Sequence, residues 1–442
     1  MRRALKLFAL AVLILVLAAL TIAAFLIYRE TETSAYQAHR LAKLADELSW
    51  EVKSGPSGDP YFPQSGPYDL RLGYSRLPEL LHNLVMHGFH VQAQARVSAR
   101  MKDLVARGLF VPYREKSQAG LEITGDGRQP LYRATFPTRV YENFEAVPSL
   151  VTDSLLFIEN RELLDATQPK KNPAIEWDRL GRAVLDKVIQ FFRAEHDVVG
   201  GSTLATQIEK YRHSPNGMTI TPQDKIQQVA SASVRAYLDG ERTLPARRRI
   251  VVDYLNTVPL SAAAGFGEAN GLGDALWAWY GLDFDETNHI LNSRFVEGEA
   301  LVEVARLYKH VLSLMVAQRR PSYYLLTGRE ALEELTNRHL RALTQAGVIP
   351  SGLRDEALKL PLSFRDSAPS APEEIRNFSA QKAVNAVRVR LASQLGLRRM
   401  YDLDRLDVSV QSTLDGELQK KTTDTLRRLK EPEYAQAAGL YG

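Results

Sequence analysis

The chain has 442 residues, which at about 100–200 residues per domain predicts more than one structural unit. Hydrophobic residues make up 45% and charged residues 24%, ordinary globular values that exclude a wholly disordered chain, a collagen and a multi-span transporter. The sequence has no cysteine, which excludes disulfides, zinc ribbons, iron–sulfur clusters and thiol catalysis, and its net charge is only +4.

The N-terminal segment predicts a membrane anchor. From Leu7 to Tyr28 the residues are almost all apolar, and a helix of about 20 such residues crosses a bilayer. Basic residues precede this run, so we expect the N-terminus in the cytoplasm and the rest outside. The alternative is a cleaved signal peptide, but its apolar core is normally about 7–15 residues long. Residues 1–30 are therefore expected to form a cytoplasmic tip and one transmembrane helix.

The same segment explains the charge of the chain. Residues 1–30 carry four basic side chains against one acidic side chain, so the remaining residues are close to neutral. A near-neutral remainder does not resemble a nucleic-acid surface, and we expect no nucleic-acid partner. The basic residues are Arg2, Arg3, Lys6 and Arg29.

Residues 31–136 are expected to form an extracytoplasmic module and linker. Residues 31–51 predict a helix, and the Pro- and Gly-rich run Val52–Asp69 predicts an extended linker. Within 70–136, apolar residues have helical spacing from Leu77 to Val85 and from Ala93 to Val105. The turn Gly125–Gly127 lies between short strand-like runs, so the module is expected to be α+β.

The rest of the chain predicts mostly helix. Residues 137–365 are expected to form one helical domain, and Asp366–Pro372 predicts a linker. Helix resumes over residues 374–430, interrupted by a short strand at Val408–Thr413.

Glu159 is the first candidate for catalysis, because it follows a run of four apolar residues, Leu155–Ile158. A carboxylate that points from such a helix into a cleft is desolvated, and desolvation makes it a stronger base. The alternative is an exposed helix residue paired with Arg161.

A second candidate site lies in Gly200–Lys210. A Gly-Gly turn followed by Ser202 and Thr203 is typical of a helix start, where free backbone N–H groups attract anions. Thr203, Gln207 and Lys210 are spaced by four and three residues, so they share one helix face. A hydroxyl, an amide and an ammonium on one face suit a diphosphate, although a capped surface helix would show the same pattern.

Downstream, Thr221–Asp224 predicts a capping box that opens another helix. The later run Ile250–Asn256 follows three arginines, which form a solvated face or meet anionic lipid. In order and spacing, these pieces resemble the glycosyltransferase family 51 domain of class A penicillin-binding proteins and monofunctional transglycosylases. The resemblance covers about residues 137–345 and includes a closing segment with Gln318 and Pro321.

The resemblance implies a mainly α, lysozyme-like domain behind one transmembrane helix, facing the outside of the bacterial inner membrane. It implies that lipid II is polymerised into β-1,4 glycan strands with inversion, with Glu159 as general base. It also implies a divalent metal, Mg²⁺ or Mn²⁺, and as partners lipid II, the nascent glycan strand, the membrane and cell-wall synthesis proteins. The residues at substrate-binding positions are Ser202, Thr203, Gln207, Lys210, Lys225 and Asn160.

The sequence departs from the family pattern. Asn160 replaces an Asp, Asp224 replaces an Arg, and Gln228 stands at the position of a second catalytic carboxylate. Arg212 is a candidate replacement for the lost phosphate-binding Arg. These departures leave two alternatives open: a degenerate protein that binds lipid II or the cell wall without turnover, and a muramidase-type hydrolase that cuts glycan with one Glu.

The end of the chain resembles the strand and helix that open a penicillin-binding transpeptidase domain. This resemblance rests on Val408–Asp415 followed by Leu418 and Gln419. Residues 366–442 are therefore expected to contain a linker and the truncated start of such a domain, without transpeptidase activity.

Overall fold

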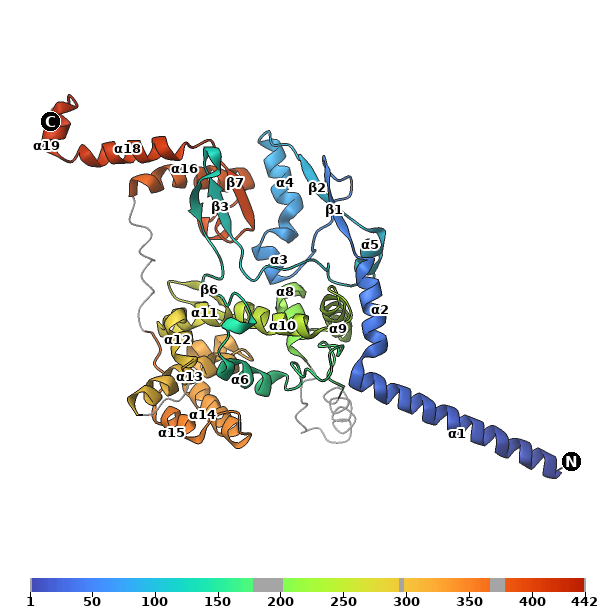
Figure 1. The fold of residues 1–442 in the computed structure, drawn as a ribbon. Helices are drawn as coiled ribbons and strands as arrows, with labels where there is room; N and C mark the ends of the chain where they lie inside the picture. Colours follow the sequence, from blue (N-terminus) through green and yellow to red (C-terminus); the bar gives the residue numbers. More distant parts are fainter. Residues whose placement is uncertain (1, 178–201, 294–297, 366–377, 441–442) are drawn as a thin grey trace.

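The structure is a computed structural model that describes residues 2–177, 202–293, 298–365 and 378–440. Helices make up 59% of it and strands 9%, so the prediction of a mainly α fold is confirmed. Two predicted features lie outside the described residues: the Gly200–Gly201 turn and the Asp366–Pro372 linker. Figure 1 shows a lower helical body, an upper mixed module and a long N-terminal helix that leaves the body.

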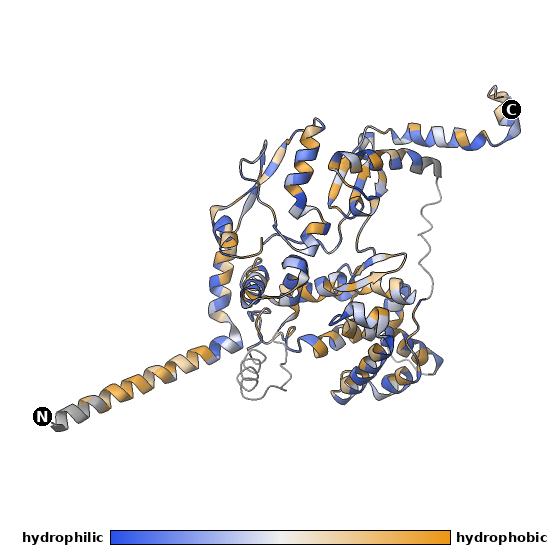
Figure 2. Ribbon diagram, turned by 180° about the vertical axis from the view of Figure 1, so that it is seen from behind, coloured by the Kyte–Doolittle hydropathy of each residue, from blue (hydrophilic) through white to orange (hydrophobic). Residues whose placement is uncertain are grey.

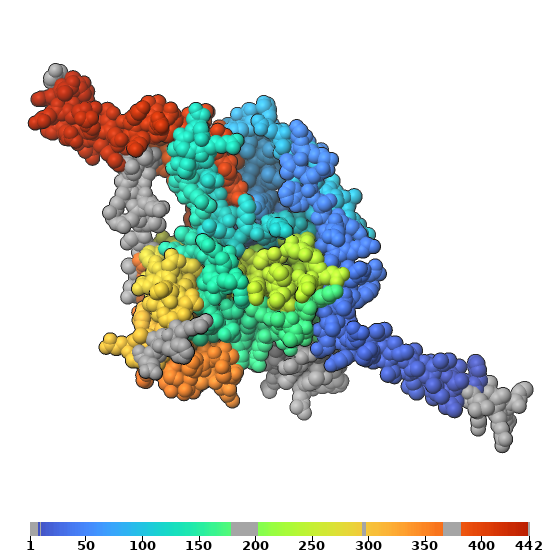
Figure 3. Space-filling model, in the orientation of Figure 1, coloured from blue at the N-terminus to red at the C-terminus, as the bar shows by residue number. Residues whose placement is uncertain are grey.

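The N-terminal helix α1 (Arg2–Thr33) projects away from the rest of the molecule (Figure 3). Its segment Leu10–Thr33 has a mean hydropathy of 3.1 and is not covered by any other part of the described chain. Figure 2 shows the middle of this helix as mostly hydrophobic, whereas the helices of the body alternate hydrophobic and hydrophilic residues. Its length and composition suffice to cross a membrane, and a signal sequence would share these properties.

The second helix, α2 (Ala35–Asp46), connects the rod to the body. It begins where the Glu30 carboxylate accepts hydrogen bonds of 2.9 Å from the backbone N–H groups of Tyr36 and Gln37. Its alanine face, Ala38 and Ala42, packs with Tyr237 at the end of α9. The base of the rod is therefore attached to the helical body.

The upper module contains a two-stranded antiparallel sheet of β1 (Trp50–Ser54) and β2 (Ala93–Val97). The expected helix over Ala93–Val105 is therefore wrong in its first half, because α5 begins only at Ala99. Residues 93–97 alternate small and polar side chains, a pattern that also fits a strand, and pairing with β1 decides between them. The other helices of this part are α3 (Pro67–Arg71) and α4 (Leu77–Met86).

A three-stranded sheet joins distant parts of the chain in the order β4-β3-β7. The predicted turn connects β3 (Leu121–Thr124) to β4 (Pro130–Arg133), and β7 (Val408–Gln411) pairs in parallel with β3. The sheet shares a hydrophobic core with α16 (Phe378–Leu395) and α4. The domain boundaries stay a prediction, but this parallel pairing places the C-terminal segment beside the N-terminal module, which the boundaries at residues 136 and 366 do not anticipate.

The lower body holds the largest hydrophobic core, built around α13 (Glu299–Ala317). Nearly every side chain of α13 from Val304 onward is buried, since neighbouring helices surround it. A hairpin of β5 (Pro259–Ala263) and β6 (Gly267–Asn270) lies between this body and the upper module. The α-helices around this core are α6 (Ser149–Glu159), α8 (Leu204–His213), α9 (Pro222–Ala236), α10 (Leu244–Thr257), α11 (Gly271–Ala275), α12 (Phe284–Leu291), α14 (Arg329–Gln345) and α15 (Ser351–Lys359).

Shorter elements complete the described chain. Two π-helical turns lie in the lower body, at Leu276–Tyr280 and Tyr323–Thr327. The C-terminal segment adds α17 (Met400–Leu403), α18 (Gly416–Arg428) and α19 (Pro432–Ala437). The 3₁₀ turns are Tyr74–Arg76, Asp126–Arg128, Phe144–Ala146 and Pro215–Gly217.

Candidate active site

Glu159 is the last residue of α6, and its side chain lies inside the lower body with only 7% of its surface exposed. Val151 and Leu155 on the same helix are fully buried, which directs the end of α6 into the interior. Each carboxylate oxygen accepts one amide hydrogen bond of 2.8 Å, Oε2 from Gln207 and Oε1 from Gln318. The two amides fix the orientation of the carboxylate. The alternative of an exposed helix residue is therefore wrong, and the role of Glu159 as a base stays a prediction.

Helix α8 brings Gln207 and Lys210 to this carboxylate. The helix begins after Thr203, whose hydroxyl accepts a hydrogen bond from the backbone N–H of Thr206 in a reciprocal capping box. Thr203 is fully buried in this capping role, and its predicted contact with substrate stays a prediction. Gln207 reaches Glu159 directly, which agrees with its place on the helix face predicted for Gln207 and Lys210.

Lys210 lies within range of the Glu159 charge, and Lys225 lies within range of the Lys210 charge. Lys225 Nζ on α9 donates to Ser202 Oγ at 2.8 Å. Burial and then the charge of Lys210 lower the pKa of Lys225 from 10.5 to about 8. Burial lowers the pKa of Lys210 as well, while the charge of Glu159 opposes this shift. Because these groups influence one another, two partly desolvated ammonium groups and one carboxylate must lie in the same region. This arrangement suits an anionic leaving group.

Two predicted site residues are engaged elsewhere. The Asn160 amide donates to Glu176, and its Oδ1 is buried without a hydrogen-bond partner among the described residues. The Gln228 amide donates to Ser214 Oγ at 3.0 Å and to Thr219 Oγ1 at 2.8 Å. Gln228 therefore ties α9 to the end of α8, and its catalytic role stays a prediction.

Asp224, which replaces the family Arg, has a structural explanation. Its carboxylate accepts hydrogen bonds of 2.8 Å from the backbone N–H groups of Ile220 and Thr221. Together with the Thr221 hydroxyl it forms the capping box predicted at the start of α9. The residue holds the helix start that carries Lys225 instead of contributing a positive charge.

Sequence reasoning left Gln318 and Tyr254 without roles. Gln318 follows α13 and orients Glu159, and its presence in the segment Leu312–Tyr324 was the only signal for it. Tyr254 Oη approaches Gln207 Oε1 at 3.5 Å, and Tyr254 lies in the run Ile250–Asn256. Gln318 binds Glu159 itself and Tyr254 contacts Gln207, so both are positioning residues.

Arg212 does not face the site. Its guanidinium is 1% exposed and pairs with Glu115, and its Nη2 donates to Thr257 Oγ1 at 2.8 Å. The suggestion that Arg212 replaces a phosphate-binding Arg is therefore wrong. The reason is helical geometry: residues 207 and 210 lie on one face of α8, whereas residues 209, 212 and 213 lie on the opposite face.

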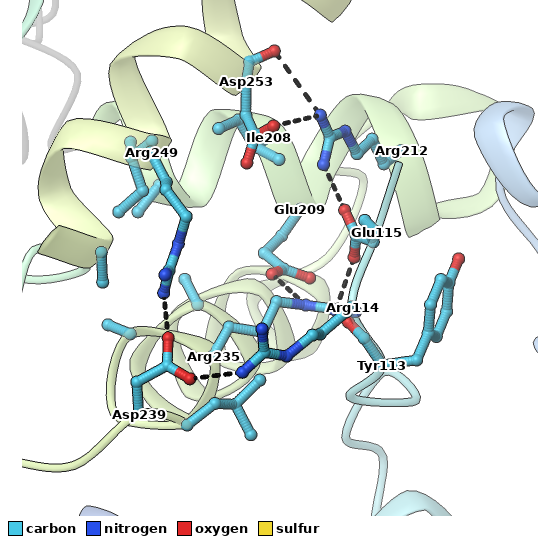
Figure 4. A pocket seen from close by; sticks show the side chains of 16 residues that line it. Tyr113, Arg114, Glu115, Ile208, Glu209, Arg212, Arg235, Asp239, Arg249 and Asp253 are labelled. Carbon is cyan, nitrogen blue, oxygen red and sulfur yellow. Dashed lines mark hydrogen bonds and ion pairs between the residues drawn. The ribbon is translucent and has the colours of Figure 1, made fainter. Parts of the chain in front are cut away.

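That opposite face carries a buried network of charges that joins α8 to the upper module. Glu115 is bound by Arg212, by His213 Nε2 at 2.7 Å and by Arg235 at 2.5 Å. Arg235 also binds Glu209 at 2.7 Å. Figure 4 shows Glu115 and Glu209 converging on Arg235 beside a cavity of about 280 Å³. The module thus contacts the helix that positions Gln207 and Lys210.

The divalent metal implied by the resemblance stays a prediction. Among the described ranges, no group of three or more His, Asp or Glu side chains could hold a metal ion. Glu159 accepts hydrogen bonds from two amides and its charge acts on Lys210, and none of these groups is a carboxylate donor of the kind that Mg²⁺ prefers. The reaction proposed for this site therefore uses the side chains of the protein.

The fold and this site combine a mainly helical body with a buried carboxylate that two amides hold, and with two partly buried lysines. Residues 129–345, about half of the chain, match the family model described as Transglycosylase. Through this domain the chain belongs to the glycosyltransferase family 51 transglycosylases, as the motifs predict. The matched region begins eight residues before the predicted boundary at residue 137, and it therefore includes β4. No curated protein matches the chain.

Proposed function

We propose that this domain polymerises lipid II into β-1,4 glycan strands, with Glu159 as general base. The observation that carries the proposal is the carboxylate held by Gln207 and Gln318 close to Lys210 and Lys225. The family match supports a peptidoglycan glycosyltransferase, whose donor leaves as a diphosphate.

The reaction follows from this arrangement. Glu159 accepts the proton of the acceptor 4-hydroxyl, and the hydroxyl oxygen forms a new bond to the anomeric carbon of the growing strand. The bond from that carbon to the diphosphate oxygen breaks, and its electron pair leaves with the diphosphate. Attack from the opposite side inverts the anomeric configuration. Lys210 and Lys225 stabilise the charge that develops on the leaving group, and Glu159 then releases its proton to solvent.

The proposed substrate requires a site at a membrane, and α1 supplies an anchor. Its apolar segment is long enough to span the bilayer, and the preceding Arg2, Arg3 and Lys6 favour a cytoplasmic N-terminus. The domain then lies on the outer side of the bacterial inner membrane, where its lipid-linked substrate is embedded. The attachment of α2 to α9 keeps the domain close to the membrane surface.

A polymerisation assay tests the proposal. Detergent-solubilised protein is given lipid II and a divalent metal, and wild type is compared with Glu159→Gln and with Glu142→Gln, an exposed control. We expect glycan strands from wild type and control, and a loss of about 10²–10⁴-fold in rate for Glu159→Gln, the usual contribution of a general base.

Three results would contradict the proposal in different ways. Equal activity of Glu159→Gln would remove Glu159 as the base. Lipid II binding without strands from any variant would establish a non-catalytic binding protein, and Gln228→Glu would then show whether a second carboxylate restores turnover. Soluble fragments released from finished peptidoglycan would establish a hydrolase.

A further inference from the structure

A second cavity lies between the lower body and the upper module. Its volume is about 760 Å³, within the range of about 300–1,000 Å³ typical of ligand pockets. Three parts of the chain line it: α3, the β5–β6 hairpin with the end of α8, and the segment around α17. Figure 1 shows α3 above α8, and β6 between the helical body and the β3–β7 sheet.

Two segments that carry residues of the proposed active site also line this cavity. Tyr211, which follows Lys210 on α8, lines it, and so does Ser322, which follows Gln318 by four residues. On the opposite wall are arginines of α3 and of the segment around α17. A substrate held at Glu159 therefore has a neighbouring space in which a further part of it can bind.

The lining is strongly cationic, with five arginines against two carboxylates. Three of the arginines are paired with carboxylates. Arg76 binds Glu79 at 2.9 Å, Arg399 binds Asp402 at 2.7 Å, and Arg212 binds Glu115. Two arginines remain, Arg71 and Arg405.

Arg71 makes neither a hydrogen bond nor an ion pair with any residue that the structure describes. Its guanidinium stacks between the rings of Tyr68, at 5.6 Å, and Phe136, at 5.2 Å. Its Nε is buried without a hydrogen-bond partner. Burial lowers the pKa of Arg71, and the charge of Glu268 opposes this shift.

Arg405 is held in the same way. Its guanidinium lies 4.2 Å from the Phe136 ring and 3.4 Å from the Tyr401 ring. Its Nη1 donates to the Tyr401 carbonyl at 3.3 Å, and its Nε is buried without a partner in the described chain. Phe136 thus contacts both guanidinium groups, which fixes two planar donors on one wall.

Glu268 is the remaining carboxylate of the lining, and its charge acts on both arginines without a direct contact among the described residues. It is exposed, and it forms no ion pair with Arg71 or Arg405 within the described ranges. Its backbone N–H donates to Tyr401 Oη at 3.1 Å, which holds β6 against the arginine wall. Desolvated guanidinium groups with free donors bind carboxylates and phosphates strongly, since a charged hydrogen bond replaces an unsatisfied one.

We propose that Arg71 and Arg405 form an anion-binding subsite that holds the carboxylates of the peptide carried by the glycan substrate. The inference rests on the proposed function, because that substrate is a disaccharide that bears a peptide next to the diphosphate. Lys210 and Lys225 already provide cations for the diphosphate, so the separate arginine pair is assigned to the peptide. A planar guanidinium fork matches a carboxylate in two hydrogen bonds, which selects peptides with free carboxylates.

Binding of soluble probes to the full-length protein tests the subsite without turnover. Isothermal titration compares a lipid-free disaccharide–pentapeptide, the same disaccharide without peptide, and inorganic pyrophosphate. Arg71→Gln and Arg405→Gln are measured against Arg399→Gln, an arginine of the same cavity that is already paired and 70% exposed. Melting temperatures verify that each variant is folded, and Arg405→Gln carries the test if Arg71→Gln does not fold.

We expect the disaccharide–pentapeptide to bind at least about tenfold more weakly to Arg71→Gln and Arg405→Gln, and equally to Arg399→Gln and wild type. Pyrophosphate affinity should be unchanged in the two arginine variants and reduced in Lys210→Ala. Equal binding of the disaccharide with and without peptide would overturn the proposal. A loss of pyrophosphate affinity in Arg71→Gln would overturn the assignment to a peptide carboxylate and identify a phosphate site.

The outcome is separable from the proposed function. Peptide-dependent binding through Arg71 in a protein that makes no glycan strands would support the subsite and contradict the polymerase. Glycan synthesis with peptide binding that does not depend on Arg71 or Arg405 would support the polymerase and contradict the subsite.

Discussion

The stability of the contact between α8 and the upper module should depend on the protonation of His213. The imidazole is 2% exposed and lies between two carboxylates, with Nδ1 2.7 Å from Asp69 and Nε2 2.7 Å from Glu115. Both ring nitrogens can donate only when the ring is an imidazolium. Arg235 also faces the ring, with its Nη2 3.4 Å from Nε2.

The magnitude follows from the pKa of His213. Burial alone would lower it, but the charge of Glu115 and the hydrogen bonds that the ring donates to Asp69 and Glu115 outweigh burial and raise the pKa from 6.5 to about 9. A pKa that is about 2.5 higher in the folded than in the unfolded protein corresponds to about 3 kcal/mol of folding free energy. Because the pKa is raised, this contribution is complete below about pH 6.5 and is lost as the pH rises through about 9.

Thermal unfolding between pH 6 and 10 measures this contribution. The useful quantity is the difference in Tm between wild type and His213→Gln, since other titrating groups affect both proteins alike. At about 2–4 °C per kcal/mol for a domain of 150–250 residues, the difference should shrink by about 6–12 °C across this range. His90→Gln, a substitution at an exposed histidine, should show a small difference that does not change with pH.

A constant Tm difference between wild type and His213→Gln from pH 6 to 10 would refute the reasoning. It would show that His213 is neutral in the folded protein, or that one of its two carboxylates carries the proton. A difference that grows with pH would reverse the sign and would contradict the assigned network as a whole.

Two further predictions concern the same helix and its neighbour. A Cβ at Gly66, where φ is +111°, would lie 2.2 Å from the Arg212 carbonyl oxygen, so Gly66→Ala should force α3 off α8 and lower both Tm and transglycosylation. Gly88→Ala, at a position with φ +86° and open space, should show only the backbone strain of about 1–3 kcal/mol. Equal losses in both variants would contradict the packing argument. Because burial and then Lys210 lower the pKa of Lys225 to about 8, its positive charge is lost as the pH rises through that value, and kcat/KM should fall there. Lys225→Arg should move this decline above pH 10, whereas Lys420→Arg on exposed α18 should leave it in place; a decline unaffected by Lys225→Arg would assign it to another group.

The sequence alone determined the features that depend on local pattern. The apolar run before Tyr28 predicts α1, the Thr221–Asp224 capping box predicts the start of α9, and the spacing of Gln207 and Lys210 predicts their shared face. Each rests on residues within one or two helical turns of each other, so no knowledge of tertiary packing is needed. The motif order added the family and, with it, the prediction that Glu159 is the base.

Tertiary structure decided everything that depends on which distant segments meet. The second amide on Glu159 comes from Gln318, 159 residues away, and no local pattern marks that contact. Helical geometry shows that Arg212 is on the far side of α8, but only the fold brings Glu115 there to bind it. Ala93–Val97 fits both a helix and a strand, and hydrogen bonds to β1 select the strand. Contacts between distant segments are chosen by the burial of whole surfaces and by the pairing of desolvated charges, which a single stretch of sequence does not specify.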